Sequence, residues 1–382
     1  MMKYKMVELG TLISQAKPVR CGDGDYPVLS MTMHDGLVFQ DDKFKKVIAS
    51  KDRSDYKVVY RNQLVISFPI DEGVLAAQRI VDAGIVSPAY GIWNIDQEQI
   101  LPEFLEYALR CERSLSYYKA KLRGSTARRR SLPTPTLLAH TIPLPSLEEQ
   151  ENILEIIHKA HDVVADRKQE LQKLDKLIKA RFVEMFGSPE YEKKQLIELI
   201  QEGAGLSYGI VVPGDNVEDG IPMVRPSDFK NGRLNLDNVY RVSSDIECKY
   251  KKTRLFGDEI LVQVIGQPGQ VMLSDERCEG MNVTRNLAVI RIDKEKADRL
   301  FISHYLITEE AQRFMFGSTN QSTLKQLPLN KLKELPVPLV PLSEQVQFAD
   351  FVKQIDKSKV AAQKALEEAQ MLFDSLMQKY FG

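Results

Sequence analysis

The 382-residue chain has little cysteine, no long apolar run and a net charge of only −1. The four cysteines lie far apart and form no C-x-x-C pair, which argues against a zinc knuckle and against a secreted disulfide framework. No apolar stretch approaches the roughly 20 residues that a membrane-spanning helix needs, and the amino terminus lacks the apolar core of a signal peptide. These absences predict a cytoplasmic protein that has no membrane partner, and the length of 382 residues predicts two or three domains.

Sequence signatures of catalysis are also missing. No G-x-x-x-x-G-K-[ST] loop is present, and Ser-Pro-Ala-Tyr at 87–90 lacks the second proline of the amino-methyltransferase motif. Asp258-Glu259 opens a strand, but no lysine follows it at nuclease spacing. His158 and His161 have no third histidine nearby to complete a metal site. We therefore expect no catalytic residue, no metal and no cofactor in this chain.

The near-zero net charge conceals a local positive patch. Residues 1–142 contain 20 basic and 16 acidic side chains, and residues 110–130 contain eight Arg or Lys against one Glu. A polyanion responds to the local potential rather than to the total charge. The basic stretch therefore favours a nucleic-acid partner, although a run of like charge is more often a solvated face.

One unusual phrase occurs twice. Residues 142–154 read IPLPSLEEQENIL and residues 337–349 read VPLVPLSEQVQFA. The prolines remove backbone donors and favour extended backbone, after which Ser146 or Ser343 can cap a helix, with Glu149 or Gln345 near its third position. The phrase thus predicts a strand-to-helix joint that is used twice.

Each joint opens a heptad pattern. Residues 142–187 align without a gap with residues 337–382, and both copies end in Phe-Gly. The first seam runs through Ile153, Ile157, Ala160, Val164, Arg167, Leu171, Leu174, Ile178, Arg181 and Met185, and the second through Phe348, Val352, Ile355, Lys359, Ala362, Leu366, Ala369, Phe373, Leu376 and Tyr380. Matching length and phase favour two helices of about 40 residues that pair with each other, with the polar Arg167 and Lys359 fixing the register. The alternative is that each helix packs only on its own domain.

The segments between the joints also echo each other. PEFLEYALR at 102–110 matches RLFISHYLI at 299–307, and Gly-Ser-Thr recurs at 124–126 and 317–319. We predict an α+β fold with two globular α+β domains that alternate with two long helices, paired as an antiparallel coiled coil in a pseudo-two-fold internal repeat. The predicted boundaries are 1–142 for the first domain, 143–187 for the first helix, 188–337 for the second domain and 338–382 for the second helix.

In combination, these features resemble the DNA specificity subunit of type I restriction-modification systems. The resemblance rests on the two joints, the helix ends Met-Phe-Gly and Tyr-Phe-Gly, the Gly-Ser-Thr turns, and the segments LSYGIVVPG at 206–214 and IPMVRPSDFKNGRL at 221–234. It implies that each globular domain is a target-recognition domain for one half of a bipartite, asymmetric site on double-stranded DNA. It also implies that the helices set the spacer between the halves and dock two adenine methyltransferase subunits.

The same resemblance implies a non-catalytic subunit. S-adenosylmethionine belongs to the methyltransferase partner, and ATP and Mg²⁺ belong to a restriction subunit where one is present. Two alternatives remain open at this point. The first alternative to a specificity subunit is a compact restriction or modification enzyme with its own activity, and the second is a coiled-coil adaptor without DNA affinity.

DNA contacts are expected mainly around the two Gly-Ser-Thr turns, because Arg and Lys neutralise phosphates and amide side chains suit base edges. In the first domain the candidates are Lys119, Lys121, Arg123, Ser125, Thr126, Arg128, Arg129 and Arg130. In the second they are Tyr208, Arg225, Lys230, Arg233, Ser318, Thr319, Asn320, Gln321 and Lys325. Arg225 is suited either to a guanine edge or simply to anchoring Asp228, and Lys230 and Arg233 to phosphates or to the solvated surface.

Overall fold

The computed structural model describes residues 4–33, 35–43, 53–122, 132–187, 190–230, 233–317 and 326–382. The chain forms two compact units, one of residues 1–169 with 363–382 and the other of residues 170–362. Unit 1 contains the first globular region, residues 4–142, which we call head 1. Unit 2 contains the second, residues 190–337, which we call head 2. Both units include parts of the two long helices, α5 (Leu147–Phe186) and α10 (Leu342–Phe381).

Head 1 is built on a four-stranded antiparallel sheet with the order β2-β9-β6-β7, and strand pairs β3-β4 and β5-β8 accompany it. Its elements are β1 (Met6–Glu8), η1 (Leu9–Thr11), β2 (Ile13–Gln15), β3 (Leu29–Thr32), β4 (Gly36–Phe39), α1 (Gln40–Lys43), β5 (Lys57–Tyr60), β6 (Leu64–Ile66), η2 (Ile70–Glu72), β7 (Leu75–Ala77), β8 (Ala83–Val86), β9 (Gly91–Ile95), α2 (Pro102–Arg110), α3 (Glu112–Lys121), α4 (Thr134–Leu138) and β10 (Thr141–Pro143).

Head 2 repeats this plan with the sheet β12-β20-β17-β18, and adds the sheet β16-β13-β19 and the pair β14-β15. Its elements are β11 (Lys193–Gln195), η4 (Leu196–Leu199), β12 (Ser207–Tyr208), β13 (Ile221–Val224), η5 (Pro226–Asp228), β14 (Phe229–Lys230), β15 (Arg233–Leu234), β16 (Tyr240–Val242), α6 (Ser244–Glu247), η6 (Cys248–Thr253), β17 (Ile260–Gln263), β18 (Val271–Leu273), η7 (Glu276–Cys278), β19 (Asn282–Val283), β20 (Leu287–Ile290), α7 (Arg299–Leu306), α8 (Glu309–Phe316), α9 (Leu329–Lys333) and β21 (Pro336–Pro338).

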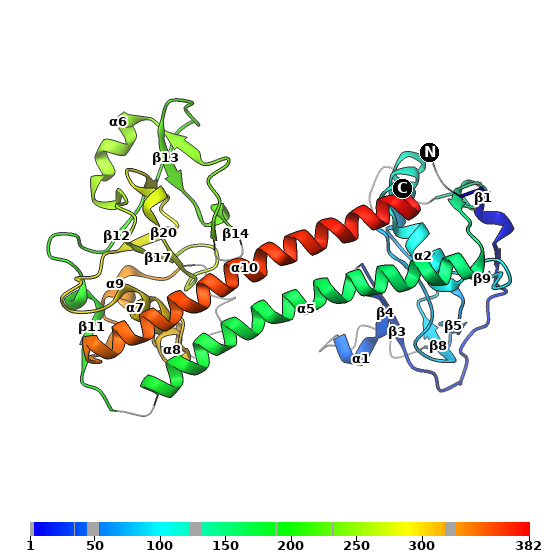
Figure 1. Cartoon of the computed structure of the whole chain (residues 1–382), viewed down its shortest axis with the longest axis horizontal. Coiled ribbons are helices and arrows are strands. Elements are labelled where there is room, and N and C mark those ends of the chain that lie inside the picture. Colours follow the sequence, from blue (N-terminus) through cyan, green and yellow to red (C-terminus); the bar gives the residue numbers. More distant parts are fainter. Residues whose placement is uncertain are drawn as a thin grey trace. The chain divides into compact units, whose positions relative to one another are not determined.

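Both heads follow their sheet with the same three helices in the same order, so the internal repeat and the α+β class are confirmed (Figure 1). The central strands β17 and β20 are buried along their whole length, which explains why they read as continuous apolar runs rather than as alternating ones. Local caps begin the helices: Pro102 stands at the first position of α2, and the Asp298 carboxylate accepts hydrogen bonds from the first backbone N–H groups of α7.

The proline joints are strands, as expected. β10 pairs antiparallel with β1 in head 1, and β21 pairs antiparallel with β11 in head 2. The first helix starts with the expected box, because the Glu149 N–H and the Ser146 hydroxyl are 3.3 Å apart and the Glu149 carboxylate reaches back to Ser146. The prediction that Ser343 caps the second helix is wrong. α10 begins at Leu342, two residues before the start that a Ser343 cap would require, so Pro341 precedes it and Ser343 lies inside the first turn.

A buried glutamine completes each joint. The Gln150 side chain accepts a hydrogen bond from the Leu101 N–H at 2.8 Å and donates to the Gln99 and Pro145 carbonyls. In head 2 the Gln345 side chain accepts from the Asp298 N–H at 2.8 Å and donates to the Val340 carbonyl at 2.7 Å. Both glutamines are almost fully buried, at 0% and 2% exposure. The Glu-Gln end of the repeated phrase therefore fastens the start of each long helix to the loop before α2 or α7.

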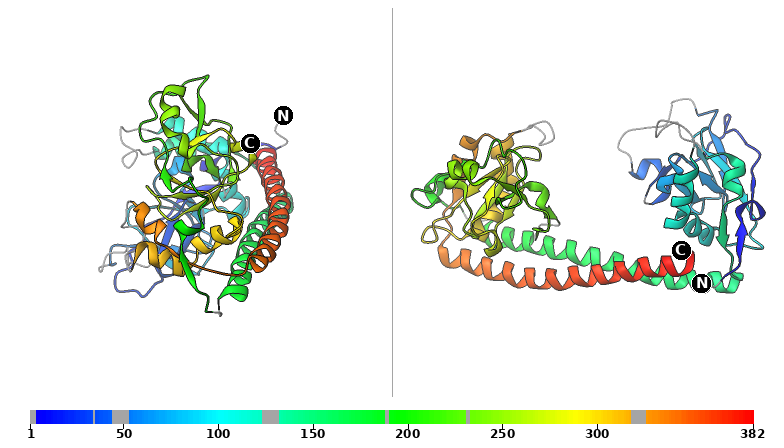
Figure 2. Two further views of the ribbon diagram at one scale, coloured as in Figure 1. Left: turned by 90° about the vertical axis from the view of Figure 1, so that its left-hand side faces the viewer. Right: turned by 90° about the horizontal axis from the view of Figure 1, so that it is seen from above.

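The long helices pair antiparallel, and they lie side by side within each unit (Figures 1 and 2). In unit 1 the rings of His161 and Phe373 are 6.3 Å apart, and in unit 2 the Lys359 ammonium lies 2.8 Å from the Asp175 carboxylate. Asp175 comes two heptads after His161 while Lys359 comes two heptads before Phe373, which is the relation that antiparallel helices require. Lys359 is therefore a polar seam residue with an ionic partner on the other helix. Arg167, the second polar seam residue named above, is exposed.

The end of each long helix lies in the core of the head that it does not follow in sequence. The Phe381 ring, at the end of α10, lies 5.0 Å from the ring of Phe104 in head 1. The Phe186 ring, at the end of α5, lies 5.1 Å from the ring of Phe301 in head 2. The repeated Phe-Gly ending is thus a core contact. Across the described part of the chain, no helix is both long and apolar enough to cross a membrane.

Candidate nucleic-acid interface

The predicted basic segment of head 1 is only partly within the described residues. Lys119 and Lys121 are exposed in the last turn of α3. Six other candidates lie outside the described residues, namely Arg123, Ser125, Thr126, Arg128, Arg129 and Arg130. Contact of this segment with DNA therefore stays a prediction.

The predicted residues of head 2 divide in a similar way. Tyr208 is half-buried on β12 and packs against the core of unit 2, so its ring supports the sheet edge. Lys230 and Arg233 face each other across the β14–β15 pair, and their side chains lie outside the described part. The other candidates also lie outside it, namely Ser318, Thr319, Asn320, Gln321 and Lys325.

Arg225 is held by its own head. Its Nη2 donates to the Asp228 carboxylate at 2.7 Å and to the Asn238 carbonyl at 3.2 Å, and its guanidinium lies 5.7 Å from the centre of the Tyr240 ring. The hydrogen bond to Asp228 raises the pKa of Arg225. Of the two roles expected for this residue, the structure therefore provides the anchor of the turn at Pro226–Asp228. A base contact by Arg225 would require its release from Asp228.

That turn forms one wall of a groove in unit 2 with a volume of about 930 Å³. The opposite wall is the loop of the β17–β18 hairpin, and α8 contributes Gln312. Lys179 of α5 also lines the groove and supplies a positive charge. Four of the lining residues are glutamines, namely Gln263, Gln267, Gln270 and Gln312.

The hairpin loop is held rigidly against α8. The Gln312 Nε2 donates to the Gly269 carbonyl at 3.1 Å and to the Leu306 carbonyl at 2.7 Å. Gly269 has a φ of +91°, and an added Cβ would meet the Gln312 Oε1 and the Phe316 ring at 2.7 Å. Only glycine fits there, both for its conformation and for the close approach. The loop therefore presents its side chains from a fixed position.

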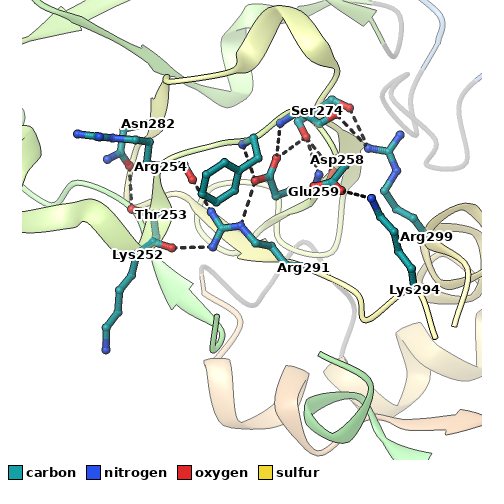
Figure 3. Close-up of polar contacts among 12 residues, drawn as sticks. Lys252, Thr253, Arg254, Asp258, Glu259, Ser274, Asn282, Arg291, Lys294 and Arg299 are labelled. Carbon is teal, nitrogen blue, oxygen red and sulfur yellow. Dashed lines mark hydrogen bonds and ion pairs between the residues drawn. The ribbon is translucent and has the colours of Figure 1, made fainter. Parts of the chain in front are cut away.

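A buried polar network surrounds Glu259, the residue directly before β17 in head 2 (Figure 3). The Glu259 carboxylate is 0% exposed and accepts from the Arg291 Nε at 3.1 Å, from the Ser274 hydroxyl at 2.8 Å and from the Phe256 N–H at 2.7 Å. Arg291 also donates to the Lys252 carbonyl at 2.9 Å. Because Glu259 is enclosed and fully bonded, this carboxylate stabilises the head rather than offering a ligand to a metal or a phosphodiester.

The neighbouring acidic and basic groups are paired as well. Asp258 lies 2.8 Å from the Lys294 ammonium, and Glu247, which is 1% exposed, is bound by Arg254. The hydrogen bond from Arg254 lowers the pKa of Glu247. Among the described residues, no group of three or more His, Cys, Asp or Glu side chains is placed to hold a metal ion.

Head 1 has a smaller cavity at the corresponding hairpin. It measures about 140 Å³ and is lined by Phe68, Ile70 and Trp93, with Leu132 at its edge. Phe68 is 50% exposed, whereas Trp93 is 5% exposed. The hairpin loop of head 1 is thus aromatic and acidic, with Asp71 and Glu72, where that of head 2 is rich in amides.

The amide loop, residues 265–270 (IGQPGQ), was not predicted as a DNA contact, because it carries no charged side chain. Two glycines and a proline between two apolar strands are a signal for a tight hairpin, and glutamine suits base edges. Gln150 and Gln345 occupy the same position in the two joints. This repetition was the sequence feature that could have predicted a common buried role.

Residues 207–369 match the family model described as the type I restriction modification DNA specificity domain. The EcoBI type I restriction enzyme specificity subunit of Escherichia coli is 26% identical over 283 residues, which cover 65% of this chain. The match spans 59% of the length of that relative.

Two solved structures share the fold. A chain from a structure that addresses the complex assembly and conformational transition of the type I R-M system superposes with a TM-score of 0.58 at 16% identity, covering 99% of this chain and 97% of that chain. The type I restriction-modification S subunit of M. genitalium gives a TM-score of 0.54 at 14% identity, covering 100% and 96%.

Proposed function

Because the chain belongs to the type I restriction-modification DNA specificity subunits, we propose that it recognises a bipartite DNA sequence, with head 1 reading one half and head 2 the other. The observation that carries this proposal is the duplication. Two sheets of the same strand order are followed by the same helices and joints, yet they carry different loops. Two unlike reading surfaces on one repeated scaffold suit an asymmetric target.

The long helices are proposed to set the distance between the two half-sites and to dock two adenine methyltransferase subunits. Most positions of their seams are apolar, and the ion pair between Lys359 and Asp175 would help to fix the pairing register. A helix advances about 1.5 Å per residue and DNA about 3.4 Å per base pair. The length of the paired helices would therefore determine the spacer.

We assign no chemistry to this chain. Methyl transfer would use S-adenosylmethionine on the methyltransferase partner, and ATP and Mg²⁺ would act on a restriction subunit where one is present. The protein would work in the cytoplasm, where it has access to the chromosome. DNA phosphates would be contacted by exposed cations such as Lys119 and Lys121, which makes the affinity dependent on salt.

The decisive experiment lengthens both helices together. One heptad is inserted after Leu171 and another after Ala362, which keeps both seams in phase, and methylated sites are mapped in cells that contain the chain and its methyltransferase. We expect the same two half-sites with a spacer that is longer by up to about three base pairs. A heptad inserted in α5 alone is the control, since it breaks the register and should abolish methylation. An unchanged spacer in the double insertion would refute the proposal.

A second measurement separates recognition from catalysis. The purified chain is incubated with DNA and labelled S-adenosylmethionine, with and without the methyltransferase. Methylation is expected only when the partner is present, together with a DNA mobility shift that weakens as salt increases. Methylation by the chain alone would identify an enzyme, and the absence of any shift in both samples would identify an adaptor.

A further inference from the structure

The amide-lined groove of head 2 has a specific hydrogen-bonding character. The Gln270 Nε2 donates to the Gln267 Oε1 at 2.7 Å, and both side chains are exposed. Within the described residues, the Gln267 Nε2 and the Gln270 Oε1 make no further hydrogen bond. The pair therefore leaves one donor, the Gln267 Nε2, and one acceptor, the Gln270 Oε1, for a ligand in the groove that both residues line. Rotating both amides by 180° gives the same result, with the roles of the two residues exchanged.

Adenine is the base that matches this pattern in the major groove. It presents an acceptor, N7, beside a donor, the N6 amino group, whereas guanine presents two acceptors. Opposite guanine, the outward carbonyl of the glutamine pair would face O6, and two acceptors would meet without a proton between them. Cytosine offers a donor without the neighbouring acceptor, and thymine offers an acceptor beside a methyl group.

The surroundings of the pair suit a reading element. Both ends of the loop are closed by backbone bonds, from the Gln263 N–H to the Gln270 carbonyl and from the Gly269 N–H to the Gln263 carbonyl, each at 2.8 Å. Gly269 rests on α8, so little backbone freedom of the loop is lost when a base binds. Lys179 lines the same groove and can contact a backbone phosphate that positions the duplex.

Comparison with head 1 gives independent support. There the Ser67 N–H bonds to the Val74 carbonyl at 3.0 Å, which closes a loop of the same length at the same place in the sheet. Gly73 occupies the position in this loop that Gly269 occupies in head 2, and it also has a positive φ, of +77°. The backbone is thus repeated, but Gln267 corresponds to Asp71 and Gln270 to the buried Val74. The side chains differ where two heads that read different sequences must differ.

We propose that Gln267 and Gln270 read an adenine, through its major-groove edge, in the half-site bound by head 2. This inference rests on the proposed function and makes it specific, because it names the reading residues of one head and the base they select. Loss of either amide should reduce discrimination against other bases at a single position by about 5- to 150-fold, the range of one two-bond contact to a base.

The test uses the full-length chain, purified from its source cells so that bound subunits are retained, and a duplex DNA library with randomised bases. The parent chain, Gln267→Ala and Gln270→Ala are each used to select bound sequences. The control is Gln201→Ala, which removes an exposed glutamine of head 2 away from the groove. The midpoint temperature of thermal unfolding is measured for each variant, and a value equal to that of the parent establishes that the variant is folded.

We expect the parent to select two half-sites, and the two groove variants to lose one A·T preference in one half while the other half and the control stay unchanged. Gln267→Arg supplies a two-donor group that suits guanine and should shift that position from A to G. Unchanged selection by both alanine variants, or loss of a G·C preference, would overturn the assignment and leave the proposed function intact. A parent chain that selects no sequence would overturn both.

Discussion

Head 1 and head 2 place a polar pair at the same point of the sheet but build it from different side chains. In head 2 it is the buried ion pair of Glu259 and Arg291. In head 1 the Gln63 Nε2 donates to the Asn94 Oδ1 at 2.7 Å, and the Tyr60 N–H donates to the Gln63 Oε1 at 2.8 Å, in the way that Phe256 donates to Glu259.

Burial separates the two pairs. Asn94 is exposed, so an amide pair there competes with water and contributes little. Arg291 is 7% exposed, because η6 covers it and supplies the Lys252 carbonyl as a further acceptor. The comparison indicates that the extra polar contacts of head 2 fasten the segment before β17 to the sheet. Head 1 has no matching segment at this point among its described elements.

The largest predicted effect tests this difference. Arg291→Ala should destabilise head 2 by about 3–5 kcal/mol, because it leaves the Glu259 carboxylate buried and unpaired. Asn94→Ala, at the equivalent position of head 1, should cost about 0.5 kcal/mol or less. Because two compact units do not unfold as one two-state system, hydrogen exchange should be followed separately in β17 and β6.

A double variant sharpens that result. Glu259→Gln added to Arg291→Ala removes the uncompensated charge and keeps an acceptor for the Phe256 N–H, so part of the lost stability should return. Equal costs for Arg291→Ala and Asn94→Ala would contradict the assigned role of burial.

The second prediction concerns a contact that the heads share. Phe381→Ala and Phe186→Ala should each destabilise the head in which the ring is buried by about 3 kcal/mol, at the low end for a lost core phenylalanine because a helix end can shift toward the gap. Phe381→Ala should increase exchange in α2 of head 1 and leave α7 of head 2 unchanged, and Phe186→Ala should do the reverse. If each variant instead affected the head that precedes its helix in sequence, the assignment of the contacts would be wrong.

The joints and the paired helices could be predicted from local sequence features. Proline positions, the heptad phase and the duplicated phrase predicted the joints and the paired helices, because each depends on neighbouring residues. The head in which Phe186 or Phe381 is buried could not be predicted in this way. Both heads contain an equivalent phenylalanine, Phe301 and Phe104, and the sequence does not tell which of the two receives a given ring.

The polar contacts were harder still to predict. Glu259 and Arg291 meet only because β17 and β20 pair. In the sequence, Glu259 belonged only to an incomplete nuclease motif, so no ion pair was predicted for it. The misplaced cap at Ser343 has a simpler cause, since Pro341 already provides the non-helical residue before α10. For the DNA interface, charge predicted a basic segment that lies largely outside the described residues, whereas the amide groove required the packing of a hairpin on α8.

A third prediction compares the two hairpin glycines. Gly269→Ala should cost about 2–3 kcal/mol, since the positive φ is strained for alanine and the new Cβ would overlap the Phe316 ring. Gly73→Ala should cost about 1 kcal/mol, because its Cβ would meet the Leu115 side chain at an ordinary 3.6 Å and only the φ strain remains. Local hydrogen exchange of β18 and β7 measures both. A larger loss at Gly73 would show that the head 2 loop is not the more tightly held of the two.

The smallest expected difference between the heads is in their response to acid. Burial lowers the pKa of His140 in head 1 and of His304 in head 2 to about 4 each, with Arg113 adding to the effect in head 1 and Lys359 in head 2. Each histidine is therefore neutral in the folded head and takes up a proton on unfolding below pH 6.5, so both heads should lose stability as the pH falls from about 6.5 toward 4. Hydrogen exchange at matched intrinsic rates, at pH 7.5 and pH 5, measures this loss. His140→Gln should reduce it in head 1 alone and His304→Gln in head 2 alone, and a pH response that survives both substitutions would assign it to the carboxylates.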